Sequence, residues 1–300
     1  MSVKEISEHI YMIDSLALGI EKFVAVYLVV GEEKNVLIDT SYASSFHVVT
    51  DCLREVGLKP ADIDYVVPTH LHLDHSGSTS KFVSISSNIM VYCHPKAVKH
   101  LVDPSKLKTS VREIYGEYAT LFGEVEPIPE KNIKSVEDGE ELDLGDITLR
   151  FIHTTGHAPH HISVYVEEEG ALITGDALSI EHPDYPSRFP TTPPPSYNHI
   201  EAINSLKKLS KLKPKIILKP HFGEKIPTSN YFEEEIRILE EWKNNVESSI
   251  NMEPEAAFEE ILRKYSEKMN IKLEEIPYHF LITLKLSFLG MRKYLSRQEL

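Results

Sequence analysis

Cysteine is scarce in this chain, at only two of its 300 residues. Cys52 falls in a predicted helix and Cys93 in a predicted strand, so neither a disulfide framework nor a thiolate metal site is expected. Residues 1–10 contain no basic segment followed by an apolar one, which argues against an export signal. We therefore expect a protein of the reducing cytoplasm.

Long apolar runs and positive charge are also scarce. The most apolar stretch, residues 280–291, is interrupted by Lys285 and falls short of the roughly 18 residues that a membrane span needs. We expect no membrane partner, and a helix here that is buried or that pairs two copies in a homo-oligomer. The 46 acidic and 32 basic residues give a net charge of −14. This argues against nucleic acid as a partner, because nucleic-acid affinity comes from neutralising phosphates.

The remaining composition is that of a globular protein. Hydrophobic residues make up 41% and charged residues 26% of the chain, which are ordinary shares. The length allows two domains or one large α/β unit. In either case we expect a sizeable hydrophobic core.

Strands and helices alternate along the first part of the sequence. β-rich runs predict strands at 10–13, 23–30, 35–39, 63–67, 89–93, 141–144, 147–152, 161–166, 171–174 and 215–218. Helical spacing predicts helices at 46–56, from about 76–78 onward, at 96–101 and at 198–212. Beyond Pro227 the sequence becomes charge-rich and predicts helices at 231–246, 253–269 and 276–295. We therefore expect a catalytic domain at 1–226 and a helical extension at 227–300 that acts as a lid, clamp or oligomerisation element.

The strongest chemical signal is the segment 70–75, with the sequence HLHLDH, directly after a predicted strand. Residues at i and i+2 of an extended chain face the same way, so His70, His72 and Asp74 can converge. The small residues that follow favour a turn into a helix, which brings His75 to the neighbouring space. Imidazoles and carboxylates without thiolates suit zinc, iron or manganese.

This segment resembles the HxHxDH signature of the metallo-β-lactamase superfamily. Four further segments match that family's pattern in order, namely LIDT at 37–40, TTGH at 154–157, LITGD at 172–176 and PHFG at 220–223. Ser41 and Pro220 stand where the family usually has glycine. The resemblance spans about residues 9–225 and implies an α/β fold, a four-layer αβ/βα sandwich followed here by the helical extension.

The resemblance also implies a ligand set for two divalent metal ions, for which zinc is expected and iron or manganese are alternatives. One ion would be bound by His70, His72 and His157, the second by Asp74, His75 and His221, with Asp176 as the bridge. Asp39 lies outside this set. It either orients a ligand imidazole or caps a turn.

The function implied is metal-dependent hydrolysis of a small carbonyl substrate, such as a thioester, lactone or related ester or amide. A metal-bound hydroxide attacks the carbonyl, the second ion holds the oxyanion, and Asp74 or a metal-held water relays the proton. Asp74 and Asp176 are thus the expected catalytic carboxylates.

Substrate contacts are expected from the proline-rich segment 181–197, which cannot be helical. It follows Asp176 and forms either a stiff wall of the substrate site or a surface crossing. Its candidate substrate-binding residues are Tyr185, Arg188 and Tyr197. By contrast, the remaining histidines near the proposed ligands, at 153, 160 and 161, are interpreted as strand histidines rather than ligands.

Three other functions remain open at this point. Some members of the family bind a single iron and oxidise persulfides, using a subset of the same ligands. A phosphodiesterase or nuclease is also possible on this fold, although the negative charge argues against it. A binding module without catalysis is the fourth interpretation.

Overall fold

The computed structural model describes residues 3–181, 188–269 and 272–298, and it divides into two compact units. The first, here called the sheet unit, comprises Met1–His153, His160–Gly175 and Pro214–Ile226. The second, the helical unit, comprises Thr154–Pro159, Asp176–Lys213 and Pro227–Leu300. The division into domains at residue 226 stays a prediction.

A seven-stranded mixed sheet forms the first half of the sheet unit. Its strands lie side by side in sequence order: β1 (Val3–Glu5), β2 (Ile10–Asp14), β3 (Ala25–Val30), β4 (Asn35–Ile38), β5 (Tyr65–Val67), β6 (Met90–Cys93) and β7 (Ile133–Ser135). The pairs from β1 to β4 are antiparallel, whereas those from β4 to β7 are parallel. The parallel strands β4 and β5 therefore end at the same edge of the sheet.

The second sheet has six strands. Their spatial order is β15 (Gly223–Lys225), β14 (Ile216–Lys219), β11 (Ala171–Ile173), β10 (Ile162–Val166), β9 (Thr148–His153) and β8 (Glu141–Asp143). All neighbours are antiparallel except β11 and β14. The parallel pair again brings two strand ends to one edge.

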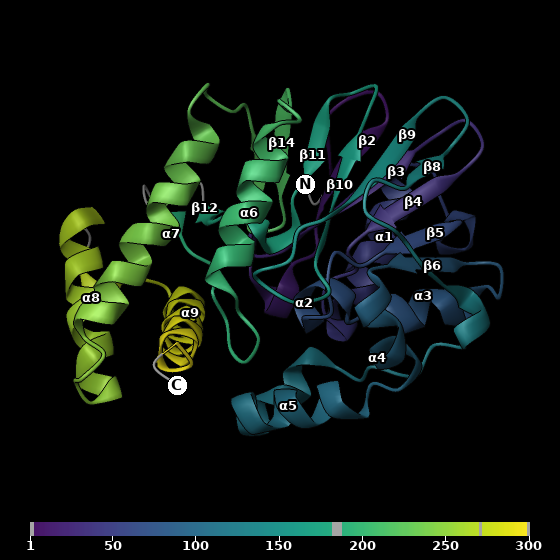
Figure 1. The fold of residues 1–300 in the computed structure, drawn as a ribbon. Helices are drawn as coiled ribbons and strands as arrows, with labels where there is room; N and C mark the ends of the chain where they lie inside the picture. Colours follow the sequence, from purple (N-terminus) through teal and green to yellow (C-terminus); the bar gives the residue numbers. More distant parts are fainter. Residues whose placement is uncertain (1–2, 182–187, 270–271, 299–300) are drawn as a thin grey trace. The chain divides into compact units, whose positions relative to one another are not determined.

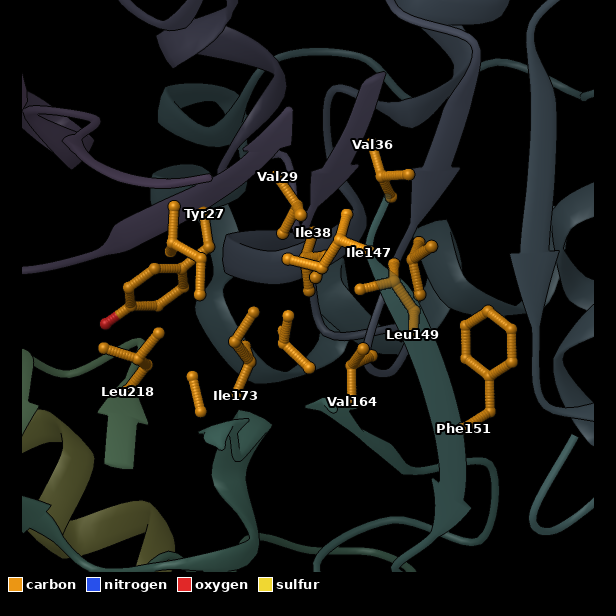
Figure 2. Close-up of a cluster of buried hydrophobic side chains, with 14 of the residues drawn as sticks. Tyr27, Val29, Val36, Ile38, Ile147, Leu149, Phe151, Val164, Ile173 and Leu218 are labelled. Atoms are coloured by element: carbon orange, nitrogen blue, oxygen red, sulfur yellow. The ribbon is translucent and has the colours of Figure 1, made fainter. Parts of the chain in front are cut away.

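The core of the sheet unit lies between the two sheets. Alternate residues of each strand point inward, and Figure 2 shows Val29 and Ile38 of the first sheet facing Leu149, Val164 and Ile173 of the second. All five are fully buried or nearly so. Burying one such aliphatic side chain stabilises a fold by about 1.5–3 kcal/mol, so this layer is the main source of stability for the unit.

Helices cover the other face of the first sheet (Figure 1). They are α1 (Phe46–Glu55), α3 (Thr79–Ile85) and α4 (Val98–Val102), and their apolar side chains share a core with that face. Two packed sheets with helices over the outer face of the first form an α/β sandwich, and the predicted fold class is confirmed.

The sequence did not predict the short strands β1, β7 and β15 or helix α5 (Ser105–Tyr115). Each of these strands has only three residues and none of them is buried. Helix α5 likewise has no buried residue. The three strands are too short to create a periodic signal. Helix α5 does have Leu107, Val111 and Ile114 at helical spacing, so here the signal was present and the prediction missed it.

The helical unit contains α6 (His199–Ser210), α7 (Tyr231–Ser248), α8 (Pro254–Met269), α9 (Tyr278–Ser296) and the pair β12 (Ile180–Glu181) and β13 (Arg188–Phe189). Helix α7 packs against α6, α8 and α9. Its buried face follows helical spacing through Phe232, Leu239, Trp242 and Val246. The three helices predicted beyond Pro227 are thus present. Among the described residues, no helix is both long enough and apolar enough to cross a membrane.

Candidate metal centre

The HLHLDH segment begins just beyond the end of β5 and turns into the short helix α2 (Leu73–Ser76). His70 and His75 are fully buried. His72 is the last extended residue before α2, and Asp74 lies in the first helical turn. The predicted change from extended chain to helix is therefore present, and it starts one turn earlier than expected.

Two imidazoles of the sheet unit lie beside the carboxylate of Asp74. The Oδ2 atom of Asp74 lies 3.4 Å from Nε2 of His221 and 3.7 Å from Nε2 of His75. His221 follows β14, so it reaches this position from the end of a strand, as predicted. One ligand atom from each of the three residues lies within 4.8 Å of the other two.

His70 and His72 form a second group in the same unit. Nε2 of His70 lies 2.9 Å from Nδ1 of His72, which is the convergence that extended spacing predicted. Nδ1 of His70 lies 3.2 Å from the hydroxyl of Thr69 and can donate to it. The ring of His70 is thereby held from the side opposite to His72.

Asp39 orients one of these imidazoles. Its Oδ2 accepts a hydrogen bond from Nδ1 of His75 at 2.8 Å, and its Oδ1 accepts one from the backbone of Thr69 at 2.7 Å. Both side chains of the His75–Asp39 pair are buried. Of the two roles left open for Asp39, orientation of a ligand imidazole is the one that the geometry supports.

The surrounding imidazoles keep Asp74 ionised. Burial favours its neutral form, but the charges of His75 and His221, a hydrogen bond from His221 and the charge of His72 together hold the pKa of Asp74 well below its usual range. A carboxylate that is ionised throughout the neutral range is the form that binds a cation.

The helical unit contributes its own pair. Nε2 of His157 lies 3.4 Å from Oδ2 of Asp176, and both residues are buried. Nδ1 of His157 donates to the backbone carbonyl of Thr191 at 3.0 Å. The two residues line a small cavity together with Tyr197 and Glu235.

These donor atoms fit divalent metal ions. Four ligands around a zinc ion at about 2.0–2.1 Å lie about 3.3 Å from one another. The separations around Asp74 and between His157 and Asp176 are 3.4–3.7 Å. The donors are imidazoles and carboxylates, as zinc, iron and manganese prefer. That the two units combine their ligands into one binuclear centre stays a prediction.

The predicted substrate contacts lie in different surroundings. Tyr185 falls outside the described residues. Tyr197 is buried and lines the cavity beside His157, with its hydroxyl 3.0 Å from Nδ1 of His199. Burial raises the pKa of Tyr197, which keeps the phenol protonated.

Arg188 is surrounded by acids. Its guanidinium nitrogens lie 3.4–3.6 Å from carboxylate oxygens of Glu181, Glu234 and Glu235. The guanidinium also lies over the ring of Tyr231, 4.7 Å from its centroid. The contacts seen for Arg188 are thus structural, and its role in substrate binding stays a prediction.

The other histidines near the ligands have separate partners. Nε2 of His153 lies 2.9 Å from the carbonyl of Val136, so its ring is satisfied by backbone as expected. His161 is fully buried, with its ring 5.0 Å from that of His70. Burial and the neighbouring imidazoles hold the pKa of His161 well below its usual value, so it is neutral.

Apart from Asp39, sequence reasoning missed the groups that hold the ligand rings. Thr69 could have been noticed because it directly precedes His70. The acceptors for His157 and His221 are the backbone carbonyls of Thr191 and Phe23. A backbone carbonyl carries no residue-specific signal, so nothing in the sequence marks these two positions.

Comparison with known proteins identifies similar proteins over most of this chain. The family model described as metallo-beta-lactamase superfamily matches residues 19–221. The metallo-beta-lactamase fold-containing protein ST1585 of Sulfurisphaera tokodaii is 31% identical over 247 residues, which cover 81% of this chain and 87% of that protein. The probable metallo-hydrolase MJ0888 of Methanocaldococcus jannaschii is 31% identical over 191 residues, 63% of this chain and 84% of that protein.

An oxidase is also similar. The coenzyme F420H(2) oxidase of Methanothermobacter marburgensis is 33% identical over 168 residues, and this match spans 54% of this chain and 36% of the oxidase. Among solved structures, that of ST1585 superposes with a TM-score of 0.70 at 24% identity and covers 97% of this chain and 99% of that one. This likeness supports the fold.

Proposed function

Because this chain belongs to the metallo-beta-lactamase superfamily, we propose that it is a binuclear metal-dependent hydrolase. Its substrate is a small carbonyl compound, such as a thioester, a lactone or a related ester or amide. The metal ligands are His70, His72, Asp74, His75, His157, Asp176 and His221. Two zinc ions are the proposed cofactor.

One repeated arrangement carries this proposal. In each of His75, His157 and His221, the Nδ1 atom lies 2.8–3.0 Å from an oxygen acceptor, and the Nε2 atom faces a carboxylate at 3.4–3.7 Å. Histidines that bind metals are held in this way, since the fixed Nδ1–H leaves Nε2 unprotonated for the ion. Three instances are hard to explain by packing alone.

The two proposed catalytic carboxylates have different roles in the hydrolysis. Two bound ions would activate a water at neutral pH and polarise the carbonyl oxygen. Asp74, ionised by its imidazole neighbours, would hold one ion and could accept the proton that the water loses. Asp176 would contribute its carboxylate to the binding of both ions. The products are a carboxylic acid and the thiol, alcohol or amine that leaves.

The test measures metal content and activity on the same preparation. Protein purified without chelators should contain about two divalent ions per chain, and it should hydrolyse at least one of a panel of thioesters and lactones. Chelation should abolish the activity and added zinc should restore it. His70→Ala should lose both metal and activity. Wild-type protein that binds no divalent ion would overturn the proposal.

Oxidation is the second candidate, and the similar oxidase is the observation that favours it. The same preparation should therefore be loaded with iron and given a persulfide in an oxygen electrode. Oxygen uptake without net hydrolysis of any ester or thioester would replace the hydrolase by an oxidoreductase. Preferential cleavage of a simple phosphodiester would instead indicate a phosphodiesterase.

A further inference from the structure

Residues 190–192 of the helical unit contact both of its proposed metal ligands. The carbonyl of Thr191 accepts the hydrogen bond from Nδ1 of His157 at 3.0 Å. The hydroxyl of Thr191 donates to the carbonyl of Asp176 at 2.8 Å. One threonine thus fixes the ring of one ligand and the backbone of the other. We call residues 190–192 the holding segment.

Two helices beyond residue 226 fix the holding segment in turn. The hydroxyl of Ser287 in α9 donates to the carbonyl of Pro190 at 2.7 Å and accepts from the backbone of Thr192 at 3.3 Å. The hydroxyl of Thr192 donates to the carbonyl of Ser287 at 2.6 Å. It also accepts from Nε1 of Trp242 in α7 at 3.0 Å.

The residues that join α7 and α9 to the holding segment are buried and closely packed. Trp242 and Thr192 are fully buried, and Ser287 is 2% exposed. At Gly290, one turn after Ser287, a Cβ atom would lie 1.9 Å from the carbonyl oxygen of Thr192. Helix α9 therefore lies against the holding segment at a distance that only glycine permits. Hydrogen bonds in such surroundings are costly to break, because the separated groups find no water.

We infer that Ser287 and Trp242 are positioning residues for the metal ligands His157 and Asp176. This inference rests on the proposed function. It assigns a role to the helical extension, which lies outside the family match because that match ends at residue 221. The physical reason is the tautomer of His157. Its Nε2 can bind an ion only while Nδ1 carries the proton and donates it to Thr191, so a displaced holding segment weakens the metal site.

The test compares substitutions that remove one hydroxyl each. Ser287→Ala removes the two hydrogen bonds of the Ser287 hydroxyl, with the carbonyl of Pro190 and the backbone of Thr192, and leaves the carbonyl of Ser287 in place. Thr192→Val removes the two hydrogen bonds of the Thr192 hydroxyl, with the carbonyl of Ser287 and Nε1 of Trp242, and Thr192→Ser keeps them. The matched control is Ser249→Ala, because Ser249 is also a buried serine but its hydroxyl bonds only within α7.

The main readout is the zinc dissociation constant of the metal-free proteins, measured against a chromophoric chelator. Cobalt(II) absorption of the same variants reports ligand geometry. We expect Ser287→Ala and Thr192→Val to bind the weaker zinc ion about 10- to 100-fold less tightly, with an altered cobalt spectrum. Thr192→Ser and Ser249→Ala should remain close to wild type. Thermal unfolding without metal checks that Ser287→Ala and Ser249→Ala are destabilised to a similar degree.

Unchanged zinc affinity in Ser287→Ala and Thr192→Val would overturn the inference. An equal loss in Ser249→Ala would also overturn it, because the effect would then follow stability and not position. Both results differ from failure of the proposed function, in which the wild-type protein itself binds no divalent ion.

Discussion

The two units hold their imidazoles by different means. In the sheet unit, the acceptor for His75 follows directly from strand pairing, because Ile38 and Val67 are paired in the parallel ladder of β4 and β5. Asp39 then lies beside Thr69 at the sheet edge. In the helical unit, the acceptor for His157 belongs to an irregular segment fixed by side chains of α7 and α9.

This difference predicts unequal tolerance to substitution. A ladder of backbone hydrogen bonds sets the position of Asp39, so few single side chains can move it. The holding segment depends on a small number of hydroxyl and indole contacts, so one substitution can displace it. The ligands of the sheet unit should therefore be lost mainly by changing the acceptor itself, whereas those of the helical unit should respond to distant changes.

The largest effect is expected from Asp39→Ala. Asp39 accepts from the backbone and hydroxyl of Thr69 and from Nδ1 of His75, all in a buried site. Each buried donor left without a partner costs about 1–3 kcal/mol, so the free energy of unfolding should fall by about 3 kcal/mol or more. Urea unfolding of the metal-free protein measures it.

Asp39→Asn is the matched variant. An asparagine can still accept from Thr69, but its amide cannot accept from the Nδ1–H of His75. We expect a smaller loss of stability and a zinc affinity about 10- to 100-fold lower. If Asp39→Ala unfolded like wild type, the sheet edge would not hold His75 in the way described.

The second prediction concerns the loss of stability when one glycine from each unit is replaced by alanine. At Gly77 a Cβ atom would lie 2.4 Å from the carbonyl oxygen of Leu73, and at Gly156 it would lie 2.4 Å from backbone atoms of Ala202. Gly156 also has a φ of 132°, which disfavours any side chain. Alanine at either position should destabilise by about 2 kcal/mol. Thermal unfolding should show both losses, with Gly156→Ala the larger because strain adds to the clash.

The sequence predicted the approach of His70 and His72 in the sheet unit for a physical reason. Strand ends and a spacing of two are local properties, so His70 and His72 could be expected to converge without knowledge of the rest of the chain. The resemblance to a family supplied His157, Asp176 and His221, which no local pattern connects to the segment 70–75.

What holds the ligands of the helical unit could not be predicted. The contacts of Ser287 with the holding segment join residues more than 90 positions apart in the chain. Arg188 illustrates the same limit, because its partners Glu234 and Glu235 come from α7. An arginine after a proposed ligand suggests a substrate contact, and only the packing of α7 reveals the carboxylates around it.

The third prediction concerns the hydrogen bonds by which α7 supports the turn after Asp176. Glu235 is 1% exposed and accepts from both the backbone and the hydroxyl of Ser179, each at 2.9 Å. Glu235→Gln removes one of these acceptors and should cost about 1–2 kcal/mol. Glu234→Gln is the control, because its partly exposed pair with Arg188 should contribute less than about 1 kcal/mol. Equal losses in the two variants of α7 would contradict this account of Glu235.

The smallest effect concerns the apolar layer between the first sheet and its helices, where both cysteines lie buried. Burial raises the pKa of the Cys93 thiol to about 12, so at pH 8 almost none of it is the reactive thiolate. Native protein should therefore react with a thiol reagent at least about 100-fold more slowly than protein in denaturant, which should titrate two thiols. Rapid labelling of the native protein would mean that the core opens readily. The contrast between a rigid sheet edge and a side-chain-dependent holding segment would then fail.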